Sequence, residues 1–182
     1  MKKAPAGKAL RLLFQDEARF GRISDRRRCW APWPARPVVA GQIVREFLYA
    51  AAAVCPWDGQ LSSLVLPWLD ADTMSRFLIH TSHHFAREHC IMFLDSAGWH
   101  TAHDLHPPSN IQLEFLPAWS PELNPTEAIW QCLRQDYIGH QVFDSLDQVA
   151  DCVCDGLHAL HQDPERVKSM TDFHWLKTLC MT

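Results

Sequence analysis

The chain has 182 residues, of which 47% are hydrophobic and 21% charged, and its formal net charge is −4. This composition is that of a globular domain long enough to bury a substantial core, which excludes a disordered or fibrous chain. The longest apolar stretch, from Phe47 to Cys55, has nine residues and is too short to span a membrane. The residues after Lys2 and Lys3 do not form the apolar core of a signal peptide.

The cysteines and the charges indicate where the protein acts. Seven cysteines without regular spacing are typical of reduced thiols, and we expect a cytoplasmic protein. Residues 1–45 hold 11 of the 17 Lys and Arg residues and only three of the 21 acids, an excess of eight positive charges. The remainder carries an excess of twelve negative charges. A basic end beside an acidic body suits a polyanionic partner, although chance placement of surface charge gives the same count.

The first part of the chain predicts three strands of an antiparallel meander. Residues 10–16 alternate at period two, which is typical of a strand. Residues 21–37 contain three consecutive arginines and three prolines, so we expect an excursion without regular structure. Residues 42–54 and 60–66 predict two further strands, joined by a turn at Asp58-Gly59.

A helix and two more strands follow. Asp70 or Asp72 is positioned to cap a helix that runs to about Arg87. The all-apolar run Cys90–Leu94 predicts a central strand buried on both faces, and Ile111–Leu116 predicts the next strand.

The last part of the chain predicts helices. Asn124 is a favoured N-cap, a proline follows it at the first helical position, and Glu127 completes a capping-box pattern. Residues 146–160 and 164–179 predict two further helices. The order of three strands, helix, two strands and helices is that of an α/β ribonuclease-H-like fold, a mixed five-stranded sheet flanked by helices.

Three carboxylates, Asp16, Asp95 and Glu127, occupy the positions where chemistry is expected. The first two end apolar runs and the third opens a helix. A carboxylate at the end of a buried strand is costly to desolvate without a partner. Three converging carboxylates would repel one another unless a cation lay between them, which indicates a divalent metal site, best suited to Mg²⁺. Glu17 and Glu122 are the rival carboxylates, and Glu127 has a structural alternative as a helix cap.

Three motifs carry a resemblance to a known family. FQDEARFG, FLDSAGWHT and LPAWSPELNPTEAIW resemble the catalytic domain of mariner-like bacterial insertion-sequence transposases of the DDE group. The resemblance implies a basic leader over residues 1–8, a catalytic domain over 9–140 and a C-terminal helical extension of it over 141–182. It implies hydrolysis of DNA at transposon ends and strand transfer into target DNA.

The resemblance also assigns roles to the triad. Asp16 would bridge two Mg²⁺ ions, Asp95 would hold one and Glu127 the other, with Mn²⁺ as a substitute. DNA, a homodimer on DNA and a separate helix-turn-helix polypeptide are the implied partners, with no membrane. Nothing before Leu10 matches the family's helix-turn-helix domains, so we expect a catalytic half, a truncated copy or one frame of a split gene. Only 31 residues lie between Asp95 and Glu127, fewer than is usual.

Several other residues are candidates for DNA contact. Arg26, Arg27 and Arg28 beside Trp30 favour binding to a DNA backbone, with a solvated loop as the alternative. His100 could contact phosphate or simply order a loop. The histidines at 80–106 and the close Cys152/Cys154 pair lack the spacing of a structural zinc site.

Two other functions stay open. The chain could be a non-catalytic DNA-binding or assembly remnant that keeps the fold without turnover. It could also be a ribonuclease-H-like nuclease that cuts generic substrates without joining ends.

Overall fold

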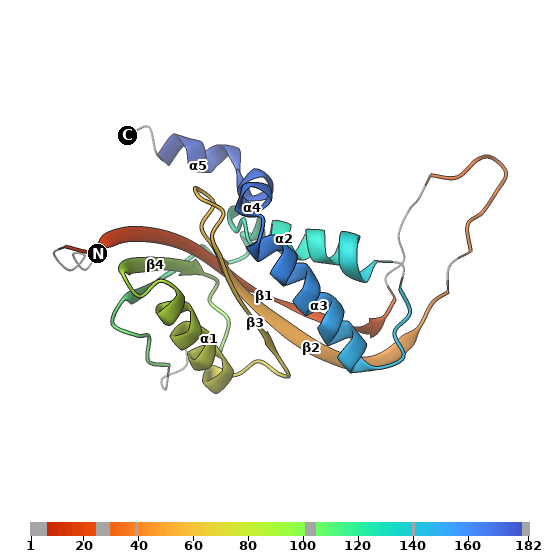
Figure 1. Ribbon diagram of the computed structural model, residues 1–182, viewed down its shortest axis with the longest axis horizontal. Helices are drawn as coiled ribbons and strands as arrows, with labels where there is room; N and C mark the ends of the chain where they lie inside the picture. Colours follow the sequence, from red (N-terminus) through yellow and green to blue (C-terminus); the bar gives the residue numbers. More distant parts are fainter. Residues whose placement is uncertain (1–6, 25–29, 39, 101–104, 140, 180–182) are drawn as a thin grey trace.

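The computed structural model describes residues 7–24, 30–38, 40–100, 105–139 and 141–179. Five strands form one mixed sheet in the order β3-β2-β1-β4-β5 (Figure 1). The strands are β1 (Ala9–Ile23), β2 (Ile43–Val54), β3 (Leu61–Leu66), β4 (Glu88–Leu94) and β5 (Ile111–Phe115). Strand β2 pairs antiparallel with both β1 and β3, whereas β4 lies parallel to both β1 and β5.

Helices cover both faces of the sheet. They are α1 (Ala71–His84), α2 (Glu127–Cys132), α3 (Leu146–His161), α4 (Pro164–Thr171) and α5 (His174–Leu179). A short 3-10 turn, η1 (Pro121–Leu123), precedes α2, and a π-helical segment, η2 (Leu133–Ile138), continues it. Helix α1 packs on one face, and α2, η2, α3 and α4 pack on the other (Figure 1).

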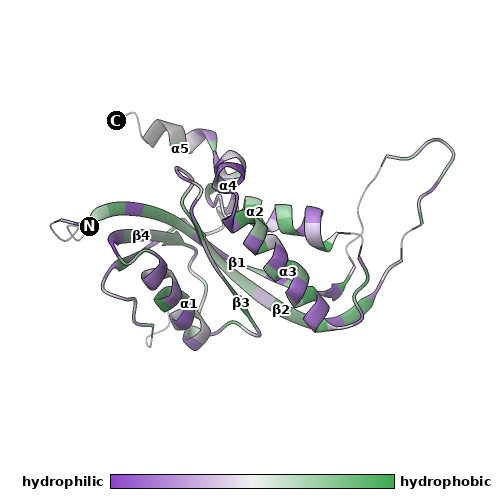
Figure 2. Ribbon diagram, in the orientation of Figure 1, coloured by the Kyte–Doolittle hydropathy of each residue, from purple (hydrophilic) through white to green (hydrophobic). Residues whose placement is uncertain are grey.

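Alternation along β1 divides the core into two layers. Phe14, Ala18 and Phe20 face the layer of α2 and α3, whereas Leu13 faces the layer of α1. Figure 2 shows the strands mostly hydrophobic, while α1 and α3 mix hydrophobic and hydrophilic residues. Successive residues of one strand therefore serve opposite sides of the sheet, a property that also separates Asp16 from Glu17.

Several predicted boundaries need correction. Strand β1 continues to Ile23 instead of ending at Asp16, because β2 pairs with it as far as Ile43. Asp16 is thus in the middle of a strand. The predicted helix over 164–179 is interrupted near Asp172, between α4 and α5. The turn at Asp58-Gly59 is confirmed, since β2 and β3 pair antiparallel across it.

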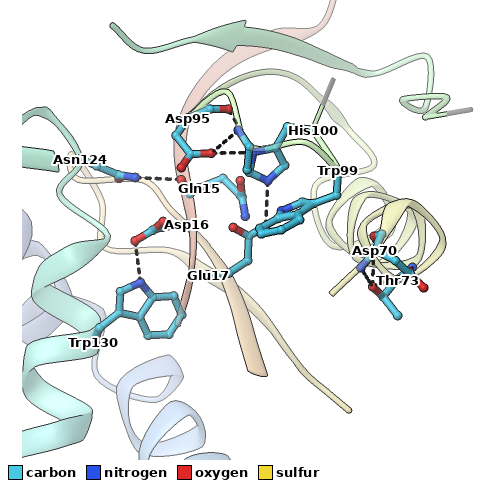
Figure 3. A network of polar contacts seen from close by, with 11 residues as sticks. Gln15, Asp16, Glu17, Asp70, Thr73, Asp95, Trp99, His100, Asn124 and Trp130 are labelled. Atoms are coloured by element: carbon cyan, nitrogen blue, oxygen red, sulfur yellow. Dashed lines mark hydrogen bonds and ion pairs between the residues drawn. The ribbon is translucent and has the colours of Figure 1, made fainter. Parts of the chain in front are cut away.

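The cap of α1 is confirmed at Asp70. Its carboxylate accepts a hydrogen bond from the Thr73 amide at 2.8 Å, and the Thr73 hydroxyl accepts one from the Asp70 amide at 2.9 Å (Figure 3). Among the helices that the structure describes, none is long and apolar enough to cross a membrane. The five described cysteines are all free thiols.

Candidate active site

The parallel pairing of β1 and β4 brings the first two acidic residues to neighbouring positions. The register pairs Phe14 with Phe93. Asp16 lies two residues after Phe14, and Asp95 lies two residues after Phe93. Strand β4 ends at Leu94, so the backbone at Asp95 turns away from the sheet while β1 continues. Both carboxylates therefore lie at the point where the parallel pair separates.

Two hydrogen bonds to the backbone of β1 fix the segment that carries Glu127. The Asn124 side-chain amide donates to the Gln15 carbonyl at 2.9 Å, and the Thr126 hydroxyl donates to the Phe14 carbonyl at 2.8 Å. Both side chains are buried. The start of α2 is thus held against the strand that bears Asp16.

The predicted capping box at this helix is wrong. Helix α2 begins at Glu127, with Thr126 before it and no side-chain cap. The Asn124 side chain instead accepts a hydrogen bond from the Thr126 amide at 3.2 Å while its amide group reaches β1. Among the described residues, none donates a hydrogen bond to the Glu127 carboxylate. Glu127 therefore does not serve as a helix cap.

The three predicted carboxylates line one hollow of about 420 Å³. Asp16, Asp95 and Glu127 share it with Asn124 and with the loop that precedes η1. Neither rival, Glu17 nor Glu122, is among the residues that line it. The structure therefore brings together three residues from three separate elements, β1, the end of β4 and the start of α2.

The electrostatics of this hollow favour a positive charge. Burial, followed by the negative charge of Glu127, raises the pKa of Asp16 to about 7. A hydrogen bond from the Trp130 indole to the Asp16 carboxylate, 2.8 Å long, acts in the opposite direction (Figure 3). Among the described residues, no basic side chain forms an ion pair with Asp16 or Glu127. A proton or a cation would relieve this repulsion.

The three carboxylates fit a hard divalent cation in their chemistry. All three are oxygen donors, the ligands that Mg²⁺ prefers. Within the part of the chain that the structure describes, however, no three His, Cys, Asp or Glu side chains are gathered around a point that could hold a metal ion. The carboxylates share a hollow without being drawn together in it.

His100 lies beneath this site, between two carboxylates. Its Nδ1 lies 2.8 Å from Oδ1 of Asp95, and its Nε2 lies 2.8 Å from Oε1 of Glu17 (Figure 3). Burial alone would lower the pKa of His100, but the hydrogen bond and charge of Glu17 and the charge of Asp95 raise it above the ordinary value. The ring is buried and both nitrogens are occupied, so the predicted direct contact with DNA does not fit its position.

The other predicted DNA contacts lie on the segment between β1 and β2. Arg26, Arg27 and Arg28 lie outside the described residues. Trp30 and Trp33 are almost fully exposed, and the described part of their segment projects away from the body (Figure 1). Exposed indoles on a projecting segment are available to a partner.

Sequence reasoning missed two features of the site. Trp119 lines the hollow with 97% of its surface exposed and a backbone φ of 60°, a conformation that is rare for a bulky residue. Gln15 is fully buried, and its side-chain amide has no hydrogen-bond partner among the described residues. The positive φ of Trp119 and the burial of Gln15 cannot be predicted from the residue types at these positions.

The match to a family model identifies the chain. Residues 11–150 match the model described as DDE superfamily endonuclease. The chain belongs to this family. An uncharacterised protein of Sinorhizobium fredii (strain NBRC 101917 / NGR234), y4pE/y4sA, is 35% identical to this chain over 128 residues, which is 70% of this chain and 95% of that protein.

Solved structures show the same fold. The Mos1 mariner paired end complex with Mn has a TM-score of 0.57 at 17% identity, covering 90% of this chain and 56% of that chain. The Mos1 strand transfer complex has a TM-score of 0.55 at 18% identity, covering 90% and 55%. The HTLV-2 integrase catalytic core domain in complex with magnesium has a TM-score of 0.51 at 8% identity, covering 84% and 87%.

These matches confirm the predicted family and the ribonuclease-H-like fold, with its mixed five-stranded sheet and flanking helices. At identities below one fifth, the structural likeness concerns the fold alone. The chain spans little more than half the length of the Mos1 chains that it resembles.

Proposed function

We propose that this DDE endonuclease is a metal-dependent transposase catalytic domain that cuts DNA at transposon ends and joins them to target DNA. The proposal is carried by the position of Asp16, Asp95 and Glu127 in one hollow, where burial and then the negative charge of Glu127 raise the pKa of Asp16. A site built only for stability would pair these charges with basic groups.

Mg²⁺ is the proposed cofactor, held by the three carboxylates, with Mn²⁺ as a substitute. Two bound ions would supply an activated water or 3′-OH and would stabilise the leaving oxygen. The chain contributes the ligands and their spacing. Asn124 and Thr126 hold Glu127 near Asp16, and the end of β4 supplies Asp95. The Mos1 and HTLV-2 proteins whose solved complexes contain Mn or magnesium share this fold, which supports the assignment.

DNA would reach the hollow along exposed aromatic rings. Trp119 stands at the hollow, and Trp30 and Trp33 stand on the projecting segment. Indole rings stack on bases without sequence preference, and the basic excess of residues 1–45 would attract the phosphate backbone. We further propose that the reaction uses two copies of the chain on DNA, and that a separate helix-turn-helix polypeptide recognises the transposon ends.

Metal titration tests the ligand assignment. Calorimetry with Mn²⁺ should show binding to the wild type and a loss of at least tenfold in affinity for Glu127→Gln, because an amide is a far weaker ligand than a carboxylate. Glu122→Gln is the matched control, since Glu122 belongs to the same motif and is exposed outside the hollow. Equal binding by both variants would contradict the assignment. A folded wild type that binds no Mn²⁺ would favour the non-catalytic remnant.

A further inference from the structure

Asp95 is the most exposed of the three acidic ligands that we propose, and its position needs an explanation. It follows the last residue of β4, and 61% of its side chain is exposed, so packing does not fix the carboxylate. A metal ligand must nevertheless be held in one orientation. Two hydrogen bonds to Oδ1 do this, one from the Ala97 amide at 2.9 Å and one from His100 at 2.8 Å.

These contacts leave one oxygen of Asp95 for a cation. Among the described residues, none donates a hydrogen bond to Oδ2, whereas Oδ1 is occupied from two sides. With Oδ1 hydrogen-bonded and Oδ2 open, the Asp95 carboxylate is arranged to bind a cation through one oxygen, as a monodentate ligand. The orientation depends on the His100 ring, which lies behind it.

The His100 ring is itself fixed by Glu17. Only 1% of the His100 side chain and 5% of the Glu17 side chain are exposed, and Nε2 lies 2.8 Å from Oε1. The Trp99 indole donates a further, longer hydrogen bond of 3.3 Å to the same Glu17 oxygen (Figure 3). Burial of a carboxylate is costly. If the side chain at this buried position served only to pack the strand, an uncharged residue would be expected in place of Glu17.

The alternation of β1 explains why two adjacent acids differ in role. Asp16 faces the hollow and α2, whereas Glu17 faces the opposite side of the sheet, under the segment from Asp95 to His100. We infer that Glu17 is a positioning residue that acts through His100 to hold the Asp95 carboxylate toward the metal. This inference rests on the proposed function.

A double-mutant cycle read as Mn²⁺ affinity tests the inference. Glu17→Ala and His100→Ala should each weaken Mn²⁺ binding by roughly tenfold, the lower end of the range for outer-shell partners. The double variant should bind no more weakly than His100→Ala, because Glu17 acts only through the ring. Additive losses would overturn the inference.

Glu17→Asp separates position from charge. Aspartate keeps the negative charge but is one methylene too short to reach Nε2, so we expect it to bind Mn²⁺ as weakly as Glu17→Ala. Wild-type affinity in Glu17→Asp would instead assign the effect to long-range electrostatics and overturn the inference. Trp99→Phe is the matched control: it removes the 3.3 Å hydrogen bond to Glu17 and leaves the His100 contacts in place.

Thermal unfolding of every variant separates this result from misfolding. If the alanine variants do not fold, Glu17→Asp decides, and wild-type affinity in it overturns the inference. Absence of Mn²⁺ binding by the folded wild type would overturn the proposed function together with this inference. Binding by the wild type with unchanged affinity in the Glu17 variants would overturn only the role of Glu17.

Discussion

A buried carboxyl group with a pKa near 7 makes Asp16 a source of instability at neutral pH. In the unfolded chain Asp16 titrates near 3.8, so between about pH 4 and pH 7 the folded state holds a proton that the unfolded state has lost. The free energy of unfolding therefore falls as pH rises through this range, by up to roughly 4 kcal/mol for a three-unit difference. The energetic penalty at neutral pH is a cost of the proposed metal site.

Asp16→Asn should remove this penalty. Asparagine can still accept the hydrogen bond from Trp130, but it carries no charge. We expect the variant to unfold at a higher temperature than the wild type in metal-free buffer at pH 8, with a difference that shrinks toward pH 4. Saturating Mg²⁺ should stabilise the wild type and leave the variant almost unchanged. A variant that is less stable than the wild type at pH 8 would contradict the raised pKa.

The sequence indicated which three acidic residues would lie near one another, but it did not indicate their contacts. Asp16, Asp95 and Glu127 could be chosen because strand alternation, a buried strand end and a motif each leave a pattern in residue type. The contact of His100 with Glu17 depends on how the segment after β4 folds back across β1. That return is a tertiary property, and no local pattern encodes it.

At the scale of elements, the junction between β1 and α2 positions the site. Thr126 is fully buried, and its hydroxyl donates to the Phe14 carbonyl. Thr126→Val removes the donor with little change in shape. We expect a loss of about 1–2 kcal/mol in the free energy of unfolding, measured by urea denaturation. We also expect weaker Mn²⁺ binding, because Glu127 is the next residue.

Thr171→Val is the matched control for this junction. Thr171 is also fully buried, but its hydroxyl bonds to Val167 within α4, away from the hollow. Its replacement should leave Mn²⁺ affinity unchanged. Equal effects of both variants on Mn²⁺ binding would show that the β1–α2 contact has no special role.

The positions of the strands could be predicted from the sequence more accurately than their ends. The alternating and apolar runs predicted the five strands at their places along the chain, because side-chain burial follows strand period. The extension of β1 to Ile23 was missed, since it depends on pairing with β2 and not on its own apolar residues. The start of α2 at Glu127 was missed because Asn124 uses its side chain to bridge to β1.

At the scale of the whole molecule, the exposed indoles of Trp30 and Trp33 lie on a segment that projects away from the body (Figure 1). We expect DNA binding to weaken steeply with salt, because the basic residues lie mainly in residues 1–45. Trp30→Ala combined with Trp33→Ala should lower affinity for DNA roughly tenfold, as expected when base stacking is lost. Fluorescence anisotropy with labelled DNA measures both effects.

Val38→Ala is the control for the projecting segment. Val38 is 94% exposed on the same segment but has no ring to stack on a base. The Val38→Ala variant should bind DNA with the affinity of the wild type. If the tryptophan variants also bind like the wild type, the segment is not a DNA contact, and the hollow must be reached by another route.

We propose that the three carboxylates catalyse a metal-dependent reaction on DNA. Cleavage and joining of labelled transposon-end DNA by the purified chain in Mg²⁺ or Mn²⁺ tests it most directly, with Asp95→Ala beside the wild type and Glu122→Ala as the control. We predict cleavage that requires metal, is lost in Asp95→Ala and is retained in Glu122→Ala. Cleavage that persists in Asp95→Ala would show that Asp95 is not a catalytic residue.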